Sequence, residues 1–266
     1  MQHCFLFTLA AILLLTGCET PDVTTESMPI ITVETTPPQD LERMALADFR
    51  DGNYNKTVEQ AQEIIKQNPK SLEALMLMGD ASFMMGNMPQ SIDSFDRAIE
   101  LEPRLKPQLW QRGLALYYAD RFKDGQEQFE SHQSYNSQDV ENAVWHLLCA
   151  SRVSGLEKAR EQFIPITQDK RVPMNEIHQL FGGVGNVEAV FAAAETTPAL
   201  GRNKAVQMYY AHLYAGLYYD MIGNRQKSIA EMKEAAKINP LRKDLLMGRV
   251  ADVHLILRQT EQTDDK

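Results

Sequence analysis

The residues best suited to acid–base, nucleophilic or metal chemistry are spread along the chain. Several helix-length segments each hold one histidine, and these are His132, His146, His178, His212 and His254. None lies in an HExxH pattern or another metal-ligand spacing, and neither GxSxG nor CxxC occurs. The glycine cluster at 182–185 lacks the Lys-Ser or Lys-Thr pair of a phosphate loop, so it favours a helix–helix turn. We therefore predict a chain that is not an enzyme, with no catalytic residues, no metal and no cofactor.

The three cysteines have different surroundings. Cys149 lies in the apolar helical pattern AVWHLLCASRV, which predicts a small buried side chain. Cys4 and Cys18 flank the apolar run from Phe5 to Leu15. That run is about half of the ~20 residues that a membrane-spanning helix needs. Its length is typical of the apolar region of a secretion signal.

The residues LTGC at 15–18 resemble the lipobox of bacterial lipoproteins. In that family a signal peptidase cuts before the cysteine, which then carries acyl chains. The resemblance implies a signal peptide over residues 1–17 and a lipidated Cys18. Glu19 stands where Asp would favour the inner membrane, so the resemblance implies the outer membrane of the cell envelope, facing the periplasm. An ordinary secretion signal with a chance cysteine is the alternative.

The segment after Cys18 and the overall charge limit the possible partners. Residues 19–40 are rich in Thr, Pro and acidic side chains without a helical period, so residues 18–40 are predicted to form a disordered tether. The net charge of −9 argues against nucleic acid, because phosphate backbones favour clustered Lys and Arg. The expected partners are other envelope proteins or peptides, and a membrane through the lipid anchor.

From residue 41 onward the sequence repeats with a period of 34, as Gly52 to Gly86 and Pro69 to Pro103 show. Phe95, Phe129 and Phe163 keep the same spacing. A period of 34 with these glycine, aromatic and proline positions resembles the tetratricopeptide repeat (TPR), a helix-turn-helix unit. The resemblance implies an all-α fold, an α-solenoid over 41–259. Its units are 41–71, 72–105, 106–139, 140–173, a degenerate 174–208, 209–242 and a C-terminal capping helix 243–259, before a frayed tail 260–266.

The repeat positions have physical reasons. A small residue such as Gly79 lets the second helix approach, and a large one such as Phe95 fills the space at the crossing. Gly86 can end a first helix in a left-handed conformation. Asn87 can then cap the second helix, whose first turn tolerates Pro89. The last helix is expected to cover the apolar face of the final repeat.

A solenoid of this type has a concave face lined by the first helix of each repeat. The TPR resemblance places twelve candidate partner-binding residues there: Met76, Asp80, Phe83, Met84, Trp110, Leu114, Tyr117, Tyr118, Leu148, Arg152, Leu217 and Asp220. Aromatic and Met side chains offer large, adaptable contact surfaces. These side chains either contact a partner or pack inside the superhelix, and the sequence leaves both open.

Three functions are compatible with these features. The favoured one is a membrane-anchored scaffold or adaptor, similar to outer-membrane TPR lipoproteins that serve cell-wall hydrolases or outer-membrane protein assembly. The second is a small-ligand receptor or enzyme with a pocket at the irregular fifth repeat, near His178, Phe181 and Arg202. The third is a self-associating structural protein, such as a homodimer joined through edge helices.

Overall fold

The computed structural model describes residues 38–196, 198, 201–238 and 246–260. The chain divides into Met1–Thr35 and a compact unit, Thr36–Lys266, and the description below concerns this second unit. The predicted signal peptide, Cys18 and residues 18–37 of the tether lie outside the described residues, as do residues 261–266 of the tail. None of the described helices combines the length and the apolar character that crossing a bilayer requires.

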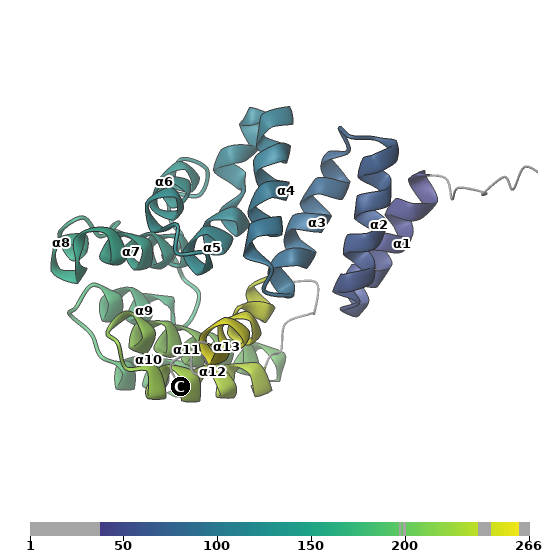
Figure 1. Cartoon of the computed structure of the whole chain (residues 1–266). Coiled ribbons are helices and arrows are strands. Elements are labelled where there is room, and N and C mark those ends of the chain that lie inside the picture. The colour runs from purple at the N-terminus through teal and green to yellow at the C-terminus, as the bar shows by residue number, and fades with distance from the viewer. Residues whose placement is uncertain (1–37, 197, 199–200, 239–245, 261–266) are drawn as a thin grey trace, which may run out of the picture. The chain divides into compact units, whose positions relative to one another are not determined.

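All regular structure in the described ranges is helical, which confirms the predicted all-α fold (Figure 1). The helices follow as successive pairs: α1 (Pro38–Asp51) and α2 (Tyr54–Gln67), α3 (Leu72–Met84) and α4 (Met88–Leu101), α5 (Trp110–Tyr118) and α6 (Phe122–Gln133), α7 (Val140–Ser154) and α8 (Leu156–Glu161), α9 (Met174–Phe181) and α10 (Val187–Thr196), α11 (Arg202–Met221) and α12 (Arg225–Ile238). A 3-10 helix, η1 (Pro103–Gln108), precedes α5, and η2 (Leu246–Arg249) precedes the last helix, α13 (Val250–Thr260).

The crossings within the pairs have the predicted small-against-large packing. A Cβ atom added at Gly79 would lie 2.7 Å from the Phe95 ring, and one at Gly113 would lie 2.5 Å from the Phe129 ring. Both distances are below van der Waals contact, so only glycine allows the two helices to cross this closely. The 34-residue period therefore corresponds to a repeated steric contact, and the chain is a solenoid of TPR-like helix pairs.

The turn between α3 and α4 shows how the sequence ends one helix and begins the next. Gly86 has a φ of +79°, the left-handed conformation expected after a helix end. The Asn87 side chain accepts a hydrogen bond from the Gln90 N–H at 3.3 Å, so it caps α4 as predicted. Pro89 lies in the first turn of α4, where no helical N–H is needed.

Several helix boundaries differ from the predicted ones. Helix α1 begins at Pro38, so residues 38–40 are helical and not part of the tether. Helix α8 ends at Glu161, and Phe163, expected inside that helix, instead stacks on His178 with ring centroids 4.4 Å apart. Helix α11 begins at Arg202, within the segment assigned to the fifth repeat. At the chain's end, α13 includes Thr260, the first residue of the predicted tail.

The last helix packs more widely than a cap for the final repeat would. It contacts α12, as expected, but it also contacts α3 near the other end of the solenoid (Figure 1). Fully buried His254 of α13 lies edge-on to Tyr118 of α5, with ring centroids 5.9 Å apart. Helix α13 therefore packs against the first helices of the second and third repeats as well as against the last repeat.

Candidate functional site

The position of α13 explains the environment of the twelve candidate groove residues. Most of them have buried side chains, which are Phe83, Met84, Leu114, Tyr117, Tyr118, Leu148 and Leu217. Met76, Asp80, Trp110 and Asp220 are half-buried, and Arg152 is exposed. The expectation that all twelve line an open groove is therefore wrong for the seven buried residues, and packing inside the superhelix describes them.

The buried aromatic rings form one cluster between the helices. Tyr118 lies 6.2 Å from Phe83 and 6.1 Å from Trp145, measured between ring centroids. Tyr117 meets Trp145 edge-on at 5.3 Å. The hydroxyl of Tyr118 is 3.2 Å from Nδ1 of His254, so its polar end has a partner inside the core. Edge-to-face rings of this kind add stability beyond the area that they bury.

Three candidate residues from different repeats meet at a polar junction. The Tyr117 hydroxyl donates a hydrogen bond to Oδ2 of Asp220 at 3.0 Å. Arg152 donates to the same oxygen from Nη2 at 3.3 Å. Burial and the negative charge of Asp220 raise the pKa of Tyr117 above its ordinary value, so its hydroxyl keeps its proton. Three residues predicted separately to face the groove are thus joined to one another.

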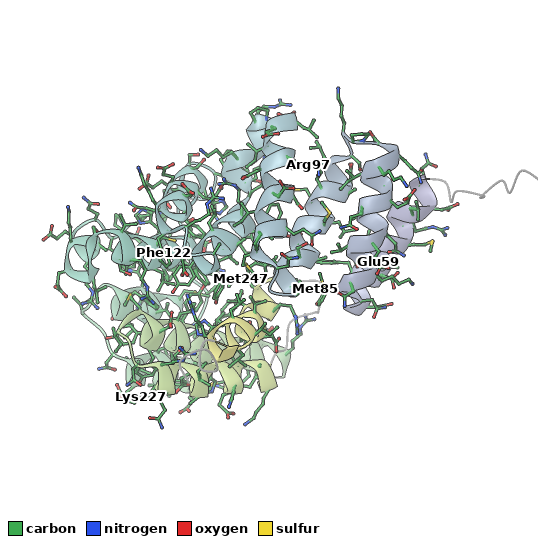
Figure 2. The ribbon with its side chains drawn as sticks, viewed as in Figure 1. Glu59, Met85, Arg97, Phe122, Lys227 and Met247 are labelled. Atoms are coloured by element: carbon green, nitrogen blue, oxygen red, sulfur yellow. The ribbon has the colours of Figure 1, made fainter. Side chains whose placement is uncertain are left out.

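A pocket of about 420 Å³ is lined in part by Trp145 of the aromatic cluster, and we call it the aromatic pocket. It is lined by Gln108, Trp110, Phe129, His132, Tyr135, Asn136, Asp139, Glu141, Asn142, Trp145 and Met247. Figure 2 shows Met247 between the N-terminal helix pairs and α13. Tyr135 is 63% exposed, whereas Trp145 is 2% exposed, so the pocket extends from the surface to the core. Of the twelve candidate residues, Trp110 lines this pocket.

Two buried polar atoms of residues lining the aromatic pocket lack hydrogen bonds. Within the described residues, neither Nε1 of Trp145 nor Oδ1 of Asn142 has a partner. The Asn142 side chain is oriented by its amide nitrogen, which donates to the Phe129 carbonyl at 3.3 Å and to Gln133 at 2.9 Å. Both atoms are buried, so they belong to the packed wall of the pocket and not to its accessible surface.

Acidic side chains line the edge of the aromatic pocket around a single cation. Arg171 donates to Asp139 at 2.6 Å, to Glu141 at 2.5 Å and to Asp169 at 2.6 Å. Glu141 also accepts a hydrogen bond from the hydroxyl of Tyr214 at 2.9 Å. Burial raises the pKa of Glu141, and the Arg171 charge opposes that rise. Asp139 and Glu141 line the pocket and share the Arg171 guanidinium, so this edge favours a basic partner.

Asp80, another of the predicted groove residues, forms no ion pair with the residues that the structure describes. Its Oδ1 is buried and has no hydrogen-bond partner in the described part of the chain. Burial raises its pKa from 3.8 to about 7. Asp80 is therefore a destabilising charge near neutral pH, because removing a carboxylate from water penalises its ionised form.

The second predicted site, at the irregular fifth repeat, is occupied by protein side chains at its centre. Phe181 is fully buried and meets the Tyr218 ring edge-on at 5.7 Å. Nε2 of His178 lies 2.9 Å from the Ile164 carbonyl, which fixes the ring against the chain. Within the described ranges, no group of three or more His, Cys, Asp or Glu side chains is placed to hold a metal ion. Cys149 is buried, and its burial raises the thiol pKa, so the thiol is un-ionised.

Sequence reasoning missed several residues of the aromatic pocket and of the aromatic cluster beside it. Trp145 lies in α7, but the TPR resemblance places the groove residues of that helix at Leu148 and Arg152. Tyr135 lies in the turn between α6 and α7, and Asn142 lies near the start of α7, where the repeat pattern assigns no groove position. His254 lies in the expected capping helix, and its contact with Tyr118 spans 136 positions of sequence. No signal in the period of 34 could have identified such a contact.

Comparisons with known proteins match this chain to solved structures at low sequence identity. No protein-family model matches the sequence, and no curated protein matches it. The solved MamA protein is 13% identical with a TM-score of 0.45, over 76% of this chain and 91% of that one. TTC0263, a thermophilic TPR protein of Thermus thermophilus, is 13% identical with a TM-score of 0.43, over 85% and 100%. PilW, a type IV pilus biogenesis factor, is 11% identical with a TM-score of 0.45, over 78% and 96%. Because these TM-scores are low, the TPR-like fold is assigned from the helix pairs of this chain itself.

Proposed function

We propose that this chain is a lipid-anchored scaffold of the bacterial cell envelope that binds a segment of another envelope protein in the aromatic pocket. The observation that carries the proposal is the pocket itself. Its walls include Trp110, Trp145 and Tyr135 at a place where the inner face is open to the surface. Rings of this kind give a large contact area and lose little side-chain entropy on binding.

The chemistry of the pocket defines the segment that it suits. A large apolar side chain would fill the space between the rings. A basic residue beside it would face Asp139 and Glu141, whose carboxylates outnumber the charge of Arg171. The preferred partner segment is therefore an apolar residue flanked by Lys or Arg.

Affinity capture from solubilised envelopes tests the binding role. The full chain should retain a discrete set of proteins, and Trp110→Ala combined with Tyr135→Ala should lose them. Val184→Ala is the matched control, because Val184 is 83% exposed and lies outside the pocket lining. Circular dichroism of each variant establishes that it is folded. Unchanged capture by the folded double variant would contradict the proposal.

The anchor has a separate test. Cys18→Ser should leave the helical unit folded and abolish both lipid labelling and recovery with membranes. The support for this step is the LTGC sequence at 15–18 and the Glu19 that follows it. If the Cys18→Ser protein still fractionated with membranes, the lipid anchor would be wrong, whereas the binding role of the pocket would stand on its own test.

A further inference from the structure

A second pocket, of about 340 Å³, lies where α7, α12 and α13 meet the turn between α5 and α6. We call it the arginine pocket, because it is lined by the guanidinium side chains of Arg152, Arg225 and Arg258. These residues come from three helices that are far apart in the sequence, and the fold brings them to one cavity. A volume of this size is at the lower end of the range for small-molecule sites.

Basic side chains outnumber acidic ones in the lining of the arginine pocket. Three arginines and two acidic residues, Asp120 and Asp220, line it, whereas the whole chain carries a net charge of −9. The ion pairs that join these acids to arginines of the lining are long. Arg258 lies 3.8 Å from Asp120, which is 65% exposed. Arg152 reaches the Asp220 carboxylate through Nη2 at 3.3 Å, which is long for a charge-assisted hydrogen bond. Its other contact with Asp220 is to the backbone carbonyl, at 3.5 Å.

The surrounding packing keeps these side chains in place. Arg152 lies over the ring of Phe122, 6.0 Å from its centroid, which orients the guanidinium toward the pocket lining. His254 at the back is fully buried, and its two ring nitrogens lie 3.2 Å from the hydroxyls of Tyr118 and Ser228. The Arg152 and Arg258 charges also act on the buried Tyr117 hydroxyl, where they oppose the rise in its pKa. Such positioning lowers the entropy cost of binding an anion.

We propose that the arginine pocket binds a small soluble oxyanion, a compound with a phosphate or a carboxylate group. The oxygens of that group would accept hydrogen bonds from the guanidinium donors, whose planar forks match both phosphate and carboxylate geometry. This site is distinct from the aromatic pocket and independent of the function proposed above. Its ligand would bridge α7, α12 and α13, so binding should hold the last helix more firmly against the solenoid.

Calorimetric titration of the purified full chain with inorganic phosphate, and separately with citrate, tests the proposal. A titration with chloride at equal ionic strength is the control. We expect saturable binding at one site for at least one of the two anions, and the preferred anion identifies the head group. Binding should also raise the melting temperature, since the ligand favours the folded state. Absence of saturable binding for both anions would overturn the proposal.

Variants with opposite expected effects locate the site. Arg225→Gln should weaken anion binding about tenfold, the effect of losing a charged hydrogen bond. Asp220→Asn should strengthen it several-fold, because it removes a competing negative charge but keeps an acceptor for Tyr117. Arg50→Gln on α1 is the control for lost positive charge, because Arg50 is exposed and lies outside the pocket lining. If Arg225→Gln does not fold, the increase in anion affinity expected for Asp220→Asn decides whether this pocket is the binding site. Equal affinity in Asp220→Asn and the parent chain, or a tenfold loss in Arg50→Gln, would overturn the assignment.

Discussion

The hydroxyl of Tyr117 on α5 donates a 3.0 Å hydrogen bond to the carboxylate of Asp220 on α11, across 103 positions of sequence. This bond joins the first helix of the third repeat to the first helix of the last complete pair. A simple solenoid has contacts between neighbouring repeats only. Here the chain also makes contacts between distant repeats, through Asp220 and through His254 of α13. We expect such contacts to make unfolding more cooperative than in an open repeat array.

Tyr117→Phe tests the energetic value of the long-range hydrogen bond. The variant keeps the ring packing but removes the hydroxyl from a buried acceptor, so the free energy of unfolding should fall by about 1–2 kcal/mol. Urea denaturation followed by circular dichroism measures the change. Tyr135→Phe is the matched control, because Tyr135 is 63% exposed and should show no measurable loss. Equal stability of Tyr117→Phe and the parent chain would show that the bond does not hold the two repeats together.

Gly113→Ala tests the repeated steric contact between the helices of a pair. The added methyl group would lie 2.5 Å from the Phe129 ring, so we expect destabilisation of about 1–3 kcal/mol from overpacking. Adding Phe129→Leu should recover part of that loss, since a smaller side chain makes room for the methyl group. Thermal and urea unfolding of both single variants and the double variant measure this coupling. Strictly additive effects would show that Gly113 does not serve the crossing.

Asp80→Asn tests the buried carboxylate through pH. Its folded-state pKa of about 7 exceeds the ordinary 3.8, so the folded chain holds this proton more tightly than the unfolded chain. The stability that this proton provides is complete below about pH 4 and is lost as pH rises to about 7. The variant should therefore exceed the parent chain by roughly 1–3 kcal/mol at about pH 8, and by little at about pH 4.5. A stability difference that does not change between these two pH values would contradict the assignment.

The sequence predicted the helix pairs because each depends on local or repeated features. Gly86, Asn87 and Pro89 end one helix and begin the next within four residues, and the structure has them in those roles. The fourth and fifth repeats were less predictable. Phe163 follows the period of 34, but it lies outside the helix because the short α8 ends before it. Its ring stacks on His178 instead.

The candidate site was predictable only in part, since a repeat pattern says where a first helix faces and not what covers that face. Tyr117, Arg152 and Asp220, three of the residues expected on the inner face, contact one another in the structure. The burial of Phe83 and Tyr118 depends on tertiary packing, including a helix more than a hundred positions later in the chain. The period of a repeat carries no information about that helix.

The central claim is that the aromatic pocket is the surface where this chain binds its protein partner. Photo-crosslinking in intact cells tests it most directly, with the photoreactive amino acid p-benzoylphenylalanine in place of Tyr135 at the pocket opening. Val184, 83% exposed and outside the pocket lining, is the control position. We predict a discrete crosslinked protein from position 135 that is missing from position 184 and is lost when Trp110→Ala is added. The same crosslinks from both positions, or none from position 135, would contradict the claim.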